Sequence, residues 1–154
     1  IAIEVGLVLA VVLFMRRIME NTSISVINKV LEVHHDGEGD DETLAIPPFV
    51  EVYEIDGPFF FGIANKFEEM ARTRSNATVR IIRMRKVSFI DATGLHNLEI
   101  FIDSTLNDSR KVILSGVNEK VYRSLERTGI IAMVGKDNVV DNIHSALNHA
   151  AEIC

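Results

Sequence analysis

Apolar and polar positions alternate in an orderly way from residue 49 onward, and the pattern predicts strands separated by helices. Phe49 to Ile55 is rich in β-branched and aromatic residues, and Thr78 to Val87 places basic residues between apolar ones; both patterns are typical of strands. The continuous apolar run Val112 to Leu114 indicates a strand that is covered on both faces. Apolar residues at helical spacing predict helices over roughly Gly62 to Thr73, over Leu95 to Leu106 and over Val121 to Leu125.

The end of the chain predicts one more strand and one more helix. Gly129 stands just past the third predicted helix, where a left-handed cap is favoured. Ile130 to Val134, closed by Gly135, is typical of a short strand. The final helix is predicted from Val139, Val140, Ile143, Ala146, Leu147 and Ala150. This order predicts an α/β fold in which about four helices flank a mostly parallel sheet.

The first residues follow a different pattern, because Val5 to Met15 are uncharged and almost wholly apolar and are followed by Arg16 and Arg17. A membrane-spanning helix needs about 20 apolar residues, and a signal peptide carries its cations before the apolar run rather than after it. We therefore expect the end of a transmembrane helix, with the arginines on its cytoplasmic side. The alternative is a helix packed on the domain or on a second copy. Since the first residue is Ile1, we expect the chain to be a piece of a longer protein.

Residues 21–48 are predicted to connect this helix to the domain. Asn21 to Val33 is mixed in character and is expected to be a connector leading into a strand. His34 to Glu42 holds five carboxylates and two glycines, which predicts an exposed acidic loop. The spacing of these carboxylates does not match an EF-hand, so solvated charges are favoured over a metal site. The chain thus divides into residues 1–20, the connector 21–48, and a domain over 49–154.

Composition and charge narrow the classes of function. With 47% hydrophobic and 25% charged residues, the chain has an ordinary globular composition, and its net charge of −6 argues against a nucleic-acid partner. The single cysteine, Cys154, excludes an internal disulfide and a cysteine zinc cluster. Phosphate-binding glycine loops and the common hydrolase motifs are absent, and His144 and His149 do not share a helix face. His96 is expected to face solvent. We therefore predict a non-enzyme without cofactor or metal.

The most informative loop runs from Val87 to Leu95, between a predicted strand and a predicted helix. In open α/β sheets, functional groups gather at the carboxyl ends of the strands. Asp91 can accept hydrogen bonds from amides of the first helical turn, and Thr93 would expose its hydroxyl. Gly94 allows close approach of the backbone or of a partner. The residues alone fit an ordinary helix start equally well, because any helix needs such residues.

Three adjacent aromatics, residues 59–61, form a second feature. Successive side chains on a helix are about 100° apart, so three neighbours cannot all face one core. Phe59 and Phe60 are therefore candidates for a partner surface, and burial of all three in a turn and sheet edge is the alternative.

Residues 90–95 (I-D-A-T-G-L) resemble the signature loop of the STAS family, which sulfate transporters share with bacterial anti-sigma-factor antagonists. The residues before the arginines resemble the end of the last membrane helix of a SulP-family anion permease. Four segments, one of which contains this loop, resemble the cytoplasmic STAS domain of such a permease in order and spacing: Val52–Gly62, Ile82–Arg85, Phe89–Leu95 and Leu125–Gly129.

This resemblance implies a non-catalytic regulatory domain at the cytoplasmic face of the plasma (bacterial inner) membrane, within a transporter of sulfate or another small anion. It implies contacts with the membrane part of the same transporter, and a role for partner contacts near Asp91 and Thr93. Acyl carrier protein is another implied partner, and a homodimer is a further expectation. Because that carrier is acidic, the chain would need a basic surface, for which the candidates are Arg80, Arg83, Arg85 and Lys86.

The antagonist branch of the family implies an alternative. There the loop carries a phosphorylated serine with an acidic residue shortly before it, and the matching positions here are Thr93 and Asp91. Thr93 is therefore a candidate phosphorylation site. The alternative function is a free-standing STAS switch that binds a kinase or another regulator.

Overall fold

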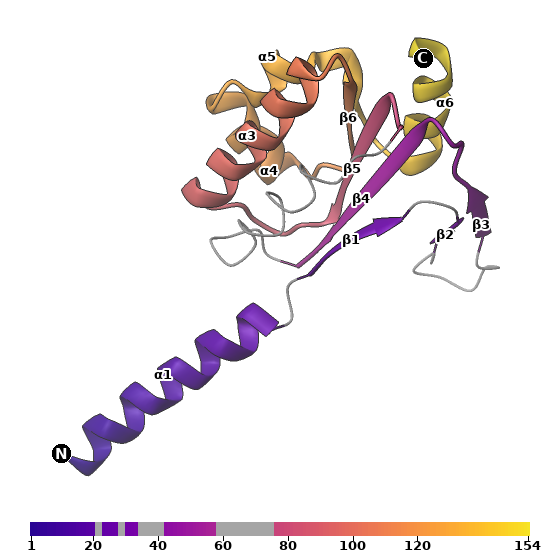
Figure 1. Ribbon diagram of the computed structural model, residues 1–154. Helices are drawn as coiled ribbons and strands as arrows, with labels where there is room; N and C mark the ends of the chain where they lie inside the picture. Colours follow the sequence, from indigo (N-terminus) through magenta and orange to yellow (C-terminus); the bar gives the residue numbers. More distant parts are fainter. Residues whose placement is uncertain (21–22, 28–29, 34–41, 58–75) are drawn as a thin grey trace.

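A five-stranded sheet in the order β1-β4-β5-β6-β7 forms the centre of the computed structural model, which describes residues 1–20, 23–27, 30–33, 42–57 and 76–154 (Figure 1). The strands are β1 (Ser23–Ile27), β4 (Val50–Asp56), β5 (Val79–Lys86), β6 (Lys111–Ser115) and β7 (Val139–Val140). The pairs from β4 to β7 are parallel, and β1 pairs antiparallel with β4. The mostly parallel sheet predicted from the sequence is confirmed. A separate two-stranded sheet joins β2 (Val30–Val33) to β3 (Glu42–Ala45).

Helices cover both faces of the sheet. One face is covered by α3 (Ala92–Asn107), α4 (Glu119–Arg127) and α5 (Ile130–Val134), and the other by α6 (Ile143–Ile153). The 3₁₀ turn η2 (Lys136–Asn138) precedes β7, and α1 (Ala2–Glu20) does not cover the sheet (Figure 1). One core lies between the sheet and α3, α4 and α5, around side chains such as Tyr53, Met84 and Phe101. The second core lies between the sheet and α6, where Ile81 and Ile113 meet Ala146. Alternate residues of β6 enter the two cores, as its continuous apolar run predicts.

The strand predicted over Ile130–Val134 is wrong, because this segment is the helix α5. Gly129, with φ of 82°, starts α5, and Ile130, Ile131 and Val134 turn to the same side and are buried. That spacing suits a short helix as well as a strand, and five residues are too few for the sequence to decide. The additional parallel strand is β7, which the sequence analysis placed in the last helix. Asn142 caps α6 two residues later, so the helix begins at Ile143.

The predicted connector also contributes more structure than expected, because residues 23–27 form β1 at the edge of the main sheet. Several expectations lie outside the described residues: the helix over Gly62–Thr73, most of the acidic loop, and Phe59 and Phe60.

The helix α1 stands apart from the two cores (Figure 1). The exposed fractions of its large apolar side chains range from 47% for Val11 to 88% for Ile3. Within the described ranges, no helix has the length and apolar content that a membrane crossing requires. Packing of α1 on the domain, the alternative raised by its sequence, would have buried these side chains.

Candidate functional site

The loop between β5 and α3 lies at the carboxyl end of the parallel strands, and Asp91 fixes where it becomes a helix. The backbone of Asp91 is extended, with φ of −90° and ψ of 176°, and its Oδ1 accepts a hydrogen bond from the Gly94 amide at 2.7 Å. The carbonyl of Asp91 accepts from the Leu95 amide at 2.9 Å. The predicted capping role of Asp91 is therefore confirmed, since its side chain satisfies an amide that has no partner within the helix.

A second residue, Asn118, holds the same loop from the neighbouring crossover. Its Nδ2 donates to the Val87 carbonyl at 2.6 Å, and its Oδ1 accepts from the Val121 amide at 2.9 Å. One side chain thus caps α4 and ties the start of α4 to the loop that carries Asp91. Asn118 was not predicted from the sequence, although an asparagine just before an amphipathic helix is a recognised capping signal.

The loop presents some of its predicted residues to solvent and hides others. Thr93, the second residue of α3, is exposed, as is Ala92 before it. Phe89 is 40% exposed. Gly94 is buried, so the close approach predicted at this glycine is not available to a partner on the described surface. The structure therefore brings Asp91 and Thr93 together at an accessible helix start.

The expected basic surface is corrected by the structure, because Arg80 and Arg83 are buried, with 1% and 6% of their surface exposed. Arg83 lies 3.5 Å from Glu54, so its charge is matched inside the fold. Arg85 and Lys86 are exposed. The Lys86 ammonium lies 3.0 Å from Asp56 and 3.5 Å from Glu54, and the hydrogen bond with Asp56 raises the pKa of Lys86. Lys86 therefore stays charged at neutral pH.

Arg80 belongs to a buried polar group beneath α3, at the opposite end of the strands from the loop. Its Nε lies 3.3 Å from Glu51, and its Nη1 donates to Thr105 at 2.9 Å. The guanidinium also lies over the rings of Tyr53 and Phe101, with its carbon 5.7 Å and 5.2 Å from the ring centroids. Burial raises the pKa of Tyr53, and a hydrogen bond with Glu51 raises it further. Arg80 was expected among the candidates for a basic surface facing an acidic partner, and its burial corrects that expectation.

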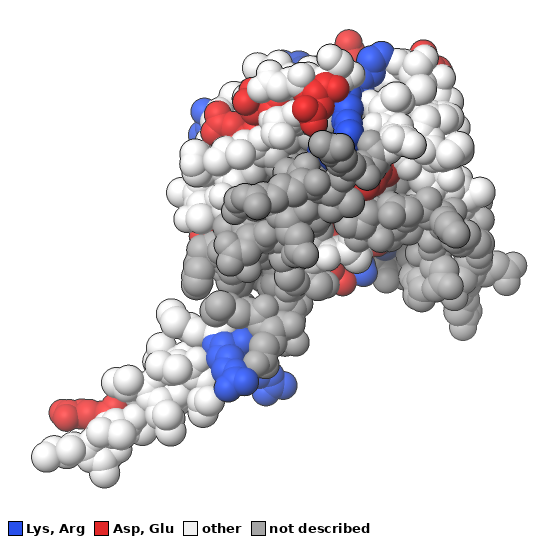
Figure 2. Space-filling model, in the orientation of Figure 1, with Lys and Arg blue, Asp and Glu red and all other residues white. Residues whose placement is uncertain are grey.

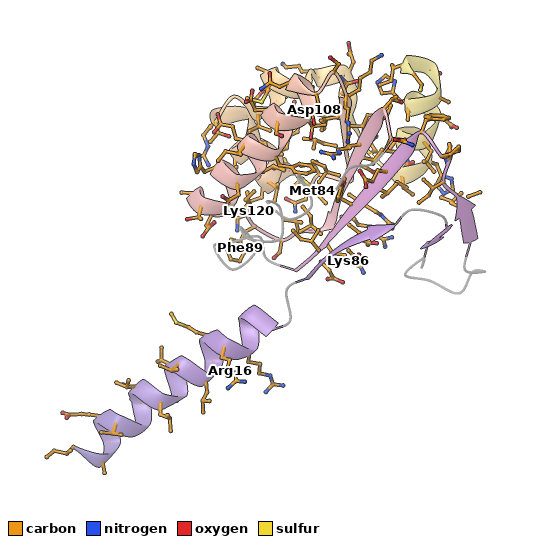
Figure 3. All side chains as sticks on the ribbon, viewed as in Figure 1. Arg16, Met84, Lys86, Phe89, Asp108 and Lys120 are labelled. Carbon is orange, nitrogen blue, oxygen red and sulfur yellow. The ribbon has the colours of Figure 1, made fainter. Side chains whose placement is uncertain are left out.

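His96, another titratable residue considered from the sequence, lies outside the buried polar group around Arg80. His96 is exposed, as expected, with its Nδ1 4.0 Å from Glu99. The described part of the chain contains no group of three or more His, Cys, Asp or Glu side chains that could hold a metal ion. The accessible features of this edge are thus a capped helix start, an exposed threonine, an exposed phenylalanine and exposed cations (Figure 3).

Comparison with known proteins identifies what this arrangement resembles. The family model of the STAS domain matches residues 43–146. A protein of Bacillus subtilis (strain 168) named as a sulfate transporter, YvdB, is 27% identical over 146 residues, which cover 92% of this chain. The chain spans only 26% of the length of that relative.

Two solved structures are similar in both sequence and fold. The sulfate transporter family protein from Wolinella succinogenes is 40% identical, with a TM-score of 0.68, over 71% of this chain and 91% of that one. The SulP transporter STAS domain from Vibrio cholerae is 34% identical, with a TM-score of 0.64, over 71% of this chain and 86% of that one.

Proposed function

The chain belongs to the STAS domain family, and we therefore propose that it is the cytoplasmic regulatory domain of a SulP-type transporter of sulfate or another small anion. The transport path would lie in membrane segments outside this chain, so no residue here is assigned to the anion. The domain would act by binding, not by catalysis, and the STAS domain is not a catalytic family.

The observation that carries this proposal is the apolar helix α1 directly before a domain that is 34% identical to a SulP transporter STAS domain. Val5 to Met15 expose apolar side chains on every face of α1, which suits a lipid or protein environment better than water. Arg16 and Arg17 follow this run, as expected at the cytoplasmic end of a membrane helix.

We place the partner contacts at the loop between β5 and α3. Asp91 and Asn118 hold this loop on the rigid sheet, so a partner meets a surface that is already ordered. The membrane part of the same transporter is the first candidate partner. For an acidic partner such as acyl carrier protein, the available basic residues of the original set are Arg85 and Lys86.

Cell fractionation tests the proposal. An antibody against residues 49–150 is used to probe membrane and soluble fractions of the native source. We expect a band much larger than 17.2 kDa in the membrane fraction. A soluble band near 17.2 kDa would contradict the transporter and support the free-standing switch. Anion uptake by cells expressing the full transporter, with and without residues 43–146, then tests regulation.

Phosphorylation of Thr93 is the second candidate role, and the exposed hydroxyl in the first turn of α3 favours it. A phosphate there would gain roughly 0.3–1 kcal/mol from the helix dipole and would be repelled by the nearby Asp91 carboxylate. Mass spectrometry of the native protein should find this phosphate, and Thr93→Ala should alter uptake or partner binding while Thr93→Ser does not. An unmodified Thr93 together with unchanged uptake in Thr93→Ala would rule this role out.

A further inference from the structure

The helix α1 joins the sheet at the carboxyl ends of β4 and β5, the edge of the domain that also carries the β5–α3 loop. Residues 21 and 22 alone separate Glu20 from Ser23, so the end of α1 lies within about 11 Å of the start of β1. Ser23 pairs with Asp56 on β4, and Asp56 pairs with Lys86 on β5. Two strand spacings amount to about 10 Å, so Lys86 lies within about 20 Å of the end of α1.

This edge carries exposed cations and an exposed aromatic ring. Arg85 and Lys86 end β5, Phe89 follows in the loop, and Lys120 lies in the first turn of α4. Figure 3 shows Lys86, Phe89 and Lys120 on the side of the domain that faces α1, with Asp108 on the opposite side. In the space-filling view, basic atoms lie on the end of α1 that is nearest the domain, and the far end of the domain carries both acidic and basic atoms (Figure 2).

Three carboxylates among the described residues near this edge have partners within the chain. Asp56 lies 3.0 Å from the Lys86 ammonium, Asp91 accepts from the Gly94 amide, and Glu119 forms an ion pair with Arg123. They therefore oppose an approaching anionic surface less than unpaired carboxylates would. An exposed aromatic ring among lysines and arginines suits the boundary between lipid headgroups and acyl chains.

We propose that this edge, defined by Arg85, Lys86, Phe89 and Lys120, docks on the anionic headgroups of the membrane in which α1 ends. The inference rests on the proposed function, because it needs α1 to be the end of a membrane helix. Docking would orient the domain with the Asp91–Thr93 loop next to the membrane. A phosphate on Thr93 would add negative charge at the docking edge and weaken the contact.

The chain contains no tryptophan, so Phe89→Trp places a single tryptophan at the docking edge, and its emission can be excited selectively over that of the tyrosines. The variant is mixed with vesicles of phosphatidylcholine alone, or of phosphatidylcholine with anionic phosphatidylglycerol. Flotation of the vesicles measures attachment through α1, and the tryptophan emission measures docking of the edge. We expect attachment to both kinds of vesicle and a blue shift only on the anionic ones, reversed by high salt. The control variant Ile100→Trp, in the middle of α3, should have the same emission wavelength with both kinds of vesicle.

Matched charge reversals give the second readout. In the Phe89→Trp background, Lys120→Glu should abolish the blue shift, whereas Lys136→Glu, in η2 before β7, should leave it unchanged. Attachment without a blue shift, or equal effects of the two reversals, would overturn the docking and leave the proposed function standing. Such a result would favour docking on the membrane part of the transporter. Failure of the protein to float with either kind of vesicle would overturn both the docking and the proposed function.

Discussion

At the scale of single residues, Asp91 links the sequence of the loop to the start of α3. Its Oδ1 accepts from the Gly94 amide at 2.7 Å, so Asp91→Ala leaves that amide without its cap. We expect this substitution to lower the free energy of unfolding by about 1 kcal/mol, within a range of roughly 0.5–2 kcal/mol. Urea unfolding of both proteins measures the difference. Asp91→Asn keeps an acceptor and should stay close to the wild type, so an equal loss in both variants would contradict the capping role.

Arg80 and Glu51 form a buried ion pair, and their burial determines how much each side chain contributes to the free energy of unfolding. Removing one partner leaves the other charged and buried, so Arg80→Met or Glu51→Gln alone is expected to cost about 3–5 kcal/mol. The double variant should cost clearly less than the sum of the two single ones, since no unpaired charge remains. Denaturant unfolding of the four proteins gives the coupling free energy. Additive effects would show that the two side chains do not stabilise each other.

Tyr53 gives this same region a pH dependence at the alkaline end. Burial raises the pKa of its phenol, so the folded chain holds the proton where the unfolded chain, with a pKa of about 10, has released it. The contribution of Tyr53 to the free energy of unfolding is therefore fully present below about pH 10 and is lost as the pH rises further. Urea unfolding at increasing pH should show a steeper alkaline loss for the wild type than for Tyr53→Phe. Parallel curves would contradict the raised pKa.

At the scale of secondary-structure elements, Asn118 couples the loop before α3 to the start of α4. Asn118→Asp keeps an oxygen that can cap α4 but replaces the donor that holds the Val87 carbonyl at 2.6 Å. We expect amide hydrogen exchange to increase in residues 87–91 while the first turn of α4 stays protected. Asn118→Ala removes both contacts and should raise exchange in both segments. Equal protection of residues 87–91 in all three proteins would contradict the coupling.

The elements also show how far the sequence can predict this fold. Strands β4, β5 and β6 were predictable because β-branched and other apolar residues are frequent in them, and helix α3 because its buried residues recur at helical spacing. Asp91 was predictable because a helix cap acts locally. Ile130–Val134 and Val139–Val140 were not, since short apolar runs take the structure that their neighbours require. Burial of Arg80 depends on Glu51, Tyr53 and Thr105, which the sequence separates.

At the scale of the whole molecule, two parts with opposite surface character meet at one edge of the sheet. The domain buries its apolar side chains in two cores, whereas α1 leaves its own exposed. Because the end of α1 and the loop with Asp91 and Thr93 share this edge, anything that holds α1 also limits how the loop can be approached. The position of α1 thus bears directly on the regulatory role proposed for the loop.

In water, without lipid or detergent, the exposed face of α1 is expected to drive self-association of the chain. Large contiguous apolar surfaces are rare on soluble monomers, and α1 exposes one along its length. Sedimentation velocity at increasing concentration should show species above 17.2 kDa. The double variant Leu9→Lys with Leu13→Lys should sediment as a monomer, because it places cations within the apolar run. Ile100→Lys, which changes a similarly exposed side chain on α3, should associate like the wild type. If this α3 variant were the monomeric one, the homodimer would form through the domain instead of through α1. The exposed apolar side chains of α1 would then not drive the self-association.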